Sequence, residues 1–85
     1  MAALTGAQIR SARALLKWSA QNLAKHASLG VNTIRRAETK DDATSLTTAN
    51  DLAIRRALEF AGVEFIDENG GGPGVRLQKR SQKKG

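Results

Sequence analysis

The chain has 85 residues, a net charge of +6 and no cysteine. This length corresponds to one small domain, and the lack of cysteine excludes disulfides and thiolate metal sites as sources of its stability. No apolar run approaches the roughly 20 residues that a membrane-spanning helix needs, and residues 1–5 lack the basic and apolar segments of a signal peptide. We therefore expect a cytoplasmic protein without a membrane partner.

The charges lie in three blocks. Residues 1–40 contain seven basic side chains and one acidic side chain, whereas residues 41–68 contain seven acidic and two basic ones. Residues 69–85 contain five basic side chains and no acidic one. Two basic blocks separated by an acidic block favour a polyanionic partner, although an ordinary solvated surface is the alternative interpretation.

The first predicted helix begins at Thr5, which can form a capping box with Gln8. Leu4 before the cap and Ile9 after it have the spacing of a hydrophobic staple. Apolar residues then recur at helical spacing. The predicted buried stripe consists of Ile9, Ala12, Leu15 and Leu16.

Two more short helices follow. Ser19 can cap the second helix, which runs to about Ala27, and Gly30 opens the third. The hydrophobic staple recurs at both starts, in the pairs Trp18 with Leu23 and Leu29 with Ile34. These closely spaced start signals indicate short helices joined by tight turns.

A polar loop over residues 40–47 precedes a fourth helix. Thr48 can cap this helix, which extends to Ala61, and Gly62 suits the left-handed position that ends it. The predicted buried stripe of the fourth helix consists of Ile54, Ala57, Leu58 and Ala61.

The pattern then changes from helical to strand-like. Residues 63–66 and 75–77 predict two short strands, and the turn residues 67–74 between them predict a hairpin loop. Residues 63–78 therefore form a predicted β-hairpin. Residues 79–85 are basic, lack apolar periodicity and predict a flexible tail.

The informative segment is residues 13–38, and its most specific part runs from Trp18 to Glu38. It has the layout of a short helix, a turn of three or four residues and a second short helix, with the small residue Ala24 where the helices meet. In length and apolar register it resembles the Cro/repressor-like helix-turn-helix family, also called the Xre family, and the resemblance covers roughly residues 5–62. It implies a mainly α fold, in which residues 1–62 form a four-helix Cro/repressor-like DNA-binding domain that precedes the hairpin.

Three positions depart from the family pattern. The family usually has glycine where Lys17 and Ser28 stand, and glutamine where Ala20 begins the second helix. In the family, an arginine of the first helix pairs with a glutamate at the end of the recognition helix. The resemblance therefore implies a structural ion pair between Arg13 and Glu38.

The third helix carries the residues expected to read DNA. A helical projection places two apolar residues on one side and four other residues on the opposite side. The apolar pair is Ile34 and Ala37, and the opposite side holds Val31, Asn32, Arg35 and Arg36. Asn pairs bidentately with adenine, Arg pairs with guanine, and Val can touch a thymine methyl group. The family's base-reading positions correspond to Val31, Asn32 and Arg36, and a merely solvated basic face is the alternative interpretation.

Phosphate contacts are expected around this helix. Ser19 and the free amide groups at the start of the second helix suit a phosphate, as helix N-termini generally do. The residues expected to contact phosphates are Ser19, Gln21, Thr33, Arg35, Thr39 and Lys40. An ordinary loop lysine is an equally good interpretation of Lys40.

Nothing in the sequence indicates an enzyme or a cofactor. Asp67 and Glu68 are adjacent at a strand end and therefore point to opposite faces. The glycine-rich residues 70–74 do not open a helix as a phosphate-binding loop does. His26 is the sole histidine, so a metal site is not expected. Trp18 can stack on a base, but its staple position favours packing in the core.

These features together predict a sequence-specific transcriptional regulator of bacterial or phage type, located at the nucleoid. The simplest mode is repression by a dimer bound to paired half-sites of double-stranded operator DNA. Because an isolated two-stranded hairpin is marginal, the hairpin is the predicted homodimer interface, through Val63, Phe65, Ile66, Val75 and Leu77. The alternative is an antitoxin or antiactivator that acts mainly through a protein partner, with the acidic middle segment or the hairpin as its working surface.

Overall fold

The computed structural model describes residues 4–66 and 74–78. The elements are, in chain order, α1 (Gly6–Leu16), α2 (Ala20–Ala27), α3 (Val31–Ala37), α4 (Thr48–Phe60), β1 (Val63–Ile66) and β2 (Gly74–Leu77). This part of the chain is mainly helical and ends in a two-stranded antiparallel hairpin, as predicted. The predicted tail over residues 79–85 and most of the predicted hairpin loop lie outside the described residues.

The first two helices begin at the predicted caps. The Thr5 hydroxyl accepts a hydrogen bond from the Gln8 amide at 3.0 Å, and the Gln8 side chain accepts one from the Thr5 amide at 3.0 Å. Ser19 caps α2 in the same way and forms a second capping box with Asn22. These reciprocal bonds satisfy amide groups that no helical carbonyl reaches.

Helix α4 begins and ends one residue earlier than predicted. Its N-cap is Thr47 rather than Thr48, because the extended backbone of Thr47 lets its hydroxyl accept from the Asn50 amide at 3.1 Å. The helix ends at Phe60. Gly62 follows with a φ of +109°, the positive φ predicted for the residue that stops this helix.

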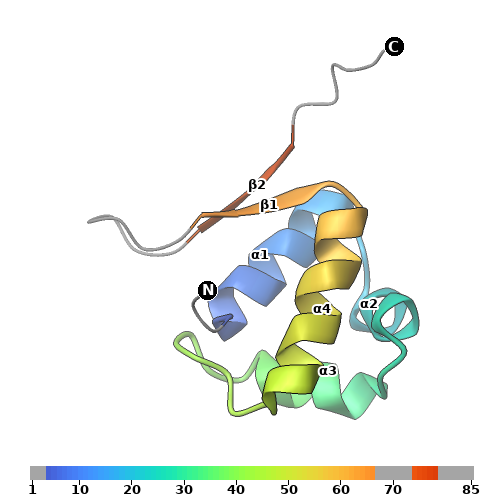
Figure 1. Ribbon diagram of the computed structural model, residues 1–85, viewed down its shortest axis with the longest axis vertical. Helices are drawn as coiled ribbons and strands as arrows, with labels where there is room; N and C mark the ends of the chain where they lie inside the picture. The colour runs from blue at the N-terminus through green and yellow to red at the C-terminus, as the bar shows by residue number, and fades with distance from the viewer. Residues whose placement is uncertain (1–3, 67–73, 79–85) are drawn as a thin grey trace.

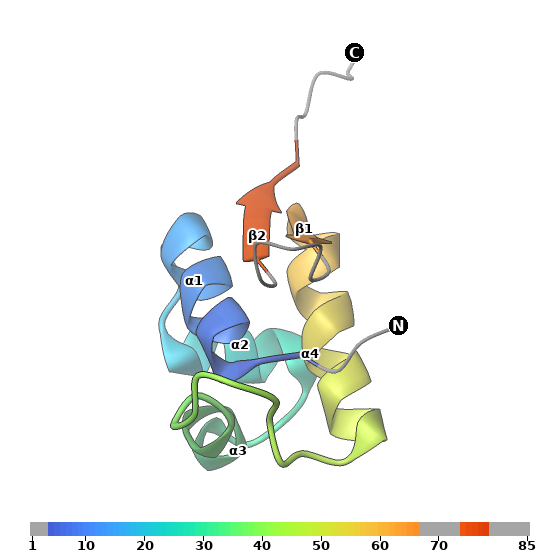
Figure 2. The ribbon, with the colours of Figure 1, turned by 90° about the vertical axis from the view of Figure 1, so that its left-hand side faces the viewer.

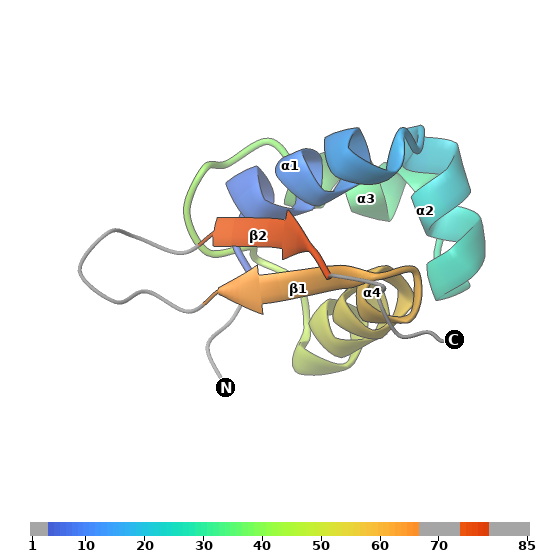
Figure 3. The same ribbon diagram turned by 90° about the horizontal axis from the view of Figure 1, so that it is seen from above.

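The hairpin and α3 lie at opposite ends of the molecule. Figure 1 and Figure 2 show α3 beside the N-terminal end of α4, away from the hairpin. Seen from above in Figure 3, β2 lies over α1 and β1 lies over α4, and these elements are in contact. The side chains that fill the centre with almost no exposure are Leu4, Ile9, Leu23, Ile34, Ile54, Leu58 and Val63.

The stripe predicted for the first helix is buried only in part. Ile9 and Ala12 are buried and Leu16 is half-buried, but Leu15 is 39% exposed. The prediction that Leu15 is buried is wrong, because the inner side of α1 is centred between Ile9, Ala12 and Leu16. Leu15 lies about 100° from Leu16 and therefore falls at the edge of that side.

The two strands pair in an antiparallel register that places Val63 opposite Leu77 and Phe65 opposite Val75. Val63 is buried, and both Phe65 and Val75 pack against the core. These four side chains share one face of the hairpin, since residues two apart on a strand point to the same side. That face covers α1 and α4.

Two polar contacts attach the hairpin to the helices. Nε2 of Gln8 donates to the Gly74 carbonyl at 3.2 Å, and the Arg55 guanidinium lies 4.7 Å from the centre of the Phe65 ring. On the outer face, Nε of Arg76 donates to Oε1 of Glu64 at 3.0 Å, and this bond lowers the pKa of Glu64.

The burial of Val63 corrects the predicted dimer interface. Its side chain is 2% exposed and belongs to the core of its own protomer, so it cannot contact a partner. Phe65 and Val75 also pack on their own helices. In the described strands, the large apolar side chains that stay accessible are Ile66, at 38%, and Leu77, at 49%.

Candidate nucleic-acid interface

Helices α2 and α3 are joined by a tight turn and packed through small and apolar side chains. The turn begins at Ser28, whose φ is 59°, and the Leu29 amide donates to the Ala24 carbonyl at 2.9 Å. Leu23, Ala24 and Ile34 are buried between the helices and the core. The turn and this packing set the direction in which the outer side of α3 points.

The outer side of α3 is polar, and its inner side is apolar. Ile34 and Ala37 are 0% and 2% exposed, as the helical projection predicted. Five residues of this helix were predicted to contact DNA. Three of them, Asn32, Arg35 and Arg36, are exposed, and the other two, Val31 and Thr33, are half-buried. Helix α3 therefore presents one carboxamide and two guanidinium groups to solvent.

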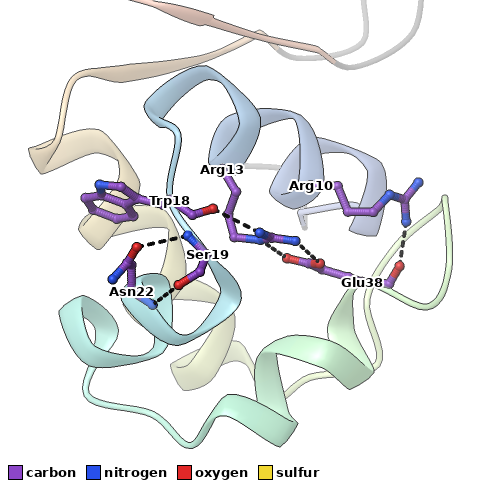
Figure 4. Close-up of polar contacts among 6 residues, drawn as sticks. All are labelled: Arg10, Arg13, Trp18, Ser19, Asn22 and Glu38. Atoms are coloured by element: carbon purple, nitrogen blue, oxygen red, sulfur yellow. Dashed lines mark hydrogen bonds and ion pairs between the residues drawn. The ribbon is translucent and has the colours of Figure 1, made fainter.

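The predicted ion pair between Arg13 and Glu38 is confirmed. Nε and Nη2 of Arg13 donate to the two carboxylate oxygens of Glu38 at 2.7 and 2.8 Å, and Nη1 donates to the Trp18 carbonyl at 3.0 Å (Figure 4). Hydrogen bonding to Glu38 raises the pKa of Arg13, against the opposing effect of burial. This bidentate pair ties α1 to the end of α3 and to the start of α2.

A second arginine of α1 holds the segment that leaves α3. Arg10 donates to the Glu38 carbonyl, as Figure 4 shows, and pairs with Asp41. Gly6 lies against the same segment, since a Cβ on this residue would be 1.8 Å from the Lys40 carbonyl oxygen. Sequence reasoning missed both contacts, because they join distant positions that no local pattern connects.

A groove of about 410 Å³ lies between α2 and the start of α3. Its lining includes the predicted DNA-contact residues Gln21 and Val31, together with Asn22, Lys25 and Leu29. Asn22 and Lys25 were not among the predicted contacts. The spacing of Gln21 and Lys25, four residues apart on one side of a helix, is the sequence signal that indicates Lys25.

The predicted phosphate-binding residues differ in whether their hydrogen-bond donors are already used within the protein. The Ser19 hydroxyl accepts from the Asn22 amide at 3.0 Å, which leaves its own proton for a ligand. The Thr39 hydroxyl donates instead to the Arg36 carbonyl at 2.8 Å, so its proton is engaged by α3. Lys40 is exposed next to Thr39.

Trp18 packs as predicted rather than standing free for a base. It is half-buried against the core, and its ring stacks on His26 with centroids 4.2 Å apart. His26 is exposed on its other side, and its Nδ1 lies 2.8 Å from the Asn22 carbonyl. The pair braces α2 against the segment that precedes it.

Among the described residues, two that are not glycine adopt the left-handed backbone conformation. Lys17 and Ser28 both have a φ of 59°, and they end α1 and α2 respectively. These are the two positions at which the family that the sequence resembles usually has glycine. Both helix ends therefore have the conformation that glycine adopts most readily.

Replacing Ser28 by glycine is expected to raise the free energy of unfolding by about 0.5–1 kcal/mol. The left-handed conformation costs a residue with a Cβ about 1–2 kcal/mol, and the entropy that glycine loses on folding offsets part of that gain. Thermal unfolding followed by circular dichroism measures the change. Ser11→Gly, at an exposed position inside α1, is the matched control and should lose about 0.5 kcal/mol, the difference in helix propensity between serine and glycine. A Ser28→Gly variant no more stable than the native chain would contradict this expectation.

No helix in the described part of the chain is long and apolar enough to cross a membrane. Comparison of the chain with protein-family models and with curated proteins gives no match.

Proposed function

We propose that this protein is a sequence-specific transcriptional regulator that binds double-stranded operator DNA through a Cro/repressor-like helix-turn-helix. One observation carries the proposal. Helix α3 buries its apolar side and exposes Asn32, Arg35 and Arg36, while the ion pair of Arg13 and Glu38 holds its end. The simplest mode of action is repression at the nucleoid by a homodimer on paired half-sites.

The proposed recognition follows from the hydrogen-bonding groups on α3. The Asn32 carboxamide suits N6 and N7 of adenine, and the Arg36 guanidinium suits O6 and N7 of guanine. Val31, which is half-buried, offers its accessible methyl group to a thymine. Phosphate contacts position the helix without reading sequence. The proposed phosphate-binding residues are Ser19, Gln21, Thr33, Arg35 and Lys40. Thr39 is left out because its hydroxyl and its amide both donate to the Arg36 carbonyl.

Two further observations support the helix-turn-helix interpretation. The bidentate pair of Arg13 and Glu38 joins the positions that are paired in the family. The left-handed conformations of Lys17 and Ser28 occur where the family usually has glycine. Both are geometric features that the amphipathic pattern of the helices does not require.

On a DNA site selected for the native protein, Arg36→Ala is expected to weaken binding by about 10- to 100-fold and to lose the preference for guanine at one position. The reason is the loss of a bidentate donor from the exposed side of α3. Fluorescence anisotropy on the selected site, on single-base variants of it and on random DNA measures both effects.

Arg35→Ala is the matched control for this experiment. Because Arg35 is a proposed phosphate contact, its replacement should weaken binding to all sequences alike. It should also reduce the slope of log K against log salt by about 0.9. Equal losses on selected and random DNA for Arg36→Ala would assign Arg36 to the phosphates. Selection that yields no preferred site for the native protein would overturn the proposed function.

A further inference from the structure

Helix α3 and the residues that follow it contain two acidic side chains, and an arginine of α1 pairs with each. The acids of residues 31–41 are Glu38 and Asp41. Arg13 binds the carboxylate of Glu38, and Arg10 binds that of Asp41. Helix α1 therefore neutralises both negative charges of a segment whose other charged side chains are basic.

The basic side chains of the same segment are not neutralised in this way. Arg35, Arg36 and Lys40 are exposed, and they form no ion pair in the described part of the chain. All three belong to the surface proposed to contact DNA. The pairing with α1 thus leaves three unpaired cations in residues 31–41 and no unpaired carboxylate.

Of the two ion pairs, that of Arg10 with Asp41 is the more exposed. The Arg10 side chain is 41% exposed and that of Asp41 is 85% exposed. An exposed ion pair contributes little to the free energy of unfolding. The larger effect of this pair is therefore on the local charge of the segment that leaves α3.

Asp41 directly follows Lys40, a proposed phosphate contact. Neighbouring Cα atoms are about 3.8 Å apart, so a phosphate held by the Lys40 ammonium group would lie roughly 10 Å from the Asp41 carboxylate. This separation is close to the Debye length of about 8–10 Å at physiological ionic strength. An unpaired carboxylate at Asp41 would therefore repel the DNA backbone at the contact made by Lys40.

The next acid along the chain, Asp42, lies one residue farther from Lys40. Its carbonyl accepts a hydrogen bond from the Gly6 amide at 3.0 Å, which directs the chain toward the start of α1. Asp41 is therefore the acid that a phosphate bound at Lys40 would meet first.

The Arg10 guanidinium is held in place beside Asp41 by a second bond. Nη1 of Arg10 donates to the Glu38 carbonyl (Figure 4), and Nη2 donates to Oδ1 of Asp41. A planar guanidinium can bind two such acceptors at once, whereas a lysine ammonium group acts as a point charge. The backbone of Glu38 thus orients the charge that neutralises Asp41.

We propose that Arg10 is a positioning residue for DNA binding, which keeps the Asp41 carboxylate paired so that the phosphate backbone can approach Lys40. The proposal rests on the proposed function, because the phosphate in question belongs to the operator. Helix α1 contributes none of the proposed DNA contacts. Through Arg10 it nevertheless sets the charge of the surface that does.

Fluorescence anisotropy on the selected site and on random DNA, at two salt concentrations, tests the proposal. Arg10→Met should weaken binding to both DNAs by about five-fold at low salt, since it leaves the Asp41 carboxylate unpaired beside a phosphate contact. The loss should shrink as salt is added. Arg10→Lys should stay within about two-fold of the native chain, because it keeps a positive charge beside Asp41.

Removal of the carboxylate distinguishes neutralisation from a purely structural role of Arg10. Arg10→Met combined with Asp41→Asn should bind DNA within about two-fold of the native chain, because the unpaired charge is gone. The bond from Arg10 to the Glu38 carbonyl is still missing in this double variant. A double variant as weak as Arg10→Met would therefore assign the loss to that bond and overturn the proposal.

Arg76→Met is the matched control. It removes the same charge as Arg10→Met and leaves Glu64 unpaired on the hairpin. The hairpin lies at the opposite end of the molecule from α3 (Figure 1 and Figure 2), so binding should change by less than about two-fold. Equal losses in Arg76→Met and Arg10→Met would show that net charge, not the position of Asp41, determines the affinity, and the proposal would be wrong.

The native chain separates this inference from the proposed function. Selection that yields no preferred DNA for the native chain would refute the proposed function, and this inference with it. A native chain that binds its selected site, with a double variant that stays weak, would refute the inference alone. Thermal unfolding checks that Arg10→Met is folded, and its melting temperature should stay close to that of the native chain.

Discussion

Replacing Glu38 by alanine is expected to lower the free energy of unfolding by about 3–5 kcal/mol, because it leaves the guanidinium of Arg13 partly buried without its carboxylate. The Arg13 side chain is 23% exposed and that of Glu38 is 10% exposed, so water replaces little of the lost contact. Urea unfolding followed by circular dichroism measures the change. Glu38→Gln is the matched control, since it keeps the shape and one acceptor, and it should lose less.

The Glu38→Ala variant also tests whether Glu38 acts on the stability of the fold or on the recognition of DNA bases. Because Glu38 faces α1 rather than the outer side of α3, the fraction of Glu38→Ala that stays folded should keep the native base preference. An unchanged melting temperature, or a changed base preference at full stability, would contradict the role of the pair as a structural tie.

Replacing Gly6 by alanine is expected to cost about 3 kcal/mol of stability, although alanine is the better helix former. The added Cβ would lie 1.8 Å from the Lys40 carbonyl oxygen and 2.7 Å from that of Ala37. Both atoms belong to the backbone, so relief requires the end of α3 to move. Thermal unfolding measures the loss, and binding to the selected DNA site should weaken with it.

Gly30→Ala is the matched control for Gly6. A Cβ at Gly30 meets nothing within 4 Å, and its φ of −74° suits any residue. The cost there should be less than about 1 kcal/mol, from a slightly poorer N-cap. Equal melting temperatures for the two variants would show that the contact of Gly6 with the segment after α3 does not constrain the fold.

The helices could be predicted from the sequence because their signals are local. A capping box needs two residues three apart, and Thr5 with Gln8 was sufficient to locate the start of α1. At α4 two adjacent threonines can both serve as the cap, and only the backbone conformation of Thr47 decides between them. Local signals therefore predict which helices form more reliably than they predict the terminal residue.

The contacts that hold the candidate site together were harder to predict, because they are long-range. Arg10 with Asp41 and Gly6 with Lys40 join segments that meet only after the chain has folded. The pair of Arg13 and Glu38 was predicted through the family resemblance, not from the pattern of charges alone. The same limit applies to Arg55, which is 9% exposed because it packs over Phe65, a residue of the hairpin.

The apolar pattern also does not distinguish a core residue from an interface residue. Phe60 lies outside the predicted buried stripe of the fourth helix and is 94% exposed, whereas Val63, predicted for the dimer interface, is buried. A sequence pattern marks residues that avoid water, but the tertiary packing decides whether a protomer buries them itself. Only the structure separates these two cases.

The contacts between the N-terminal segment and the segment after α3 have a consequence for how activity is lost. The Gly6 amide donates to the Asp42 carbonyl at 3.0 Å, and the Thr44 amide donates to the Leu4 carbonyl at 3.0 Å. A helix of seven residues is unstable in isolation, so α3 depends on such anchors. A local opening of residues 4–6 would free the segment after α3 from the N-terminal segment and uncover Leu4, while Arg13 still holds Glu38 and the helices around Ile54 and Leu58 stay packed. The proposed DNA binding would then weaken at temperatures where most of the core is still packed, so it would be more heat-sensitive than the fold.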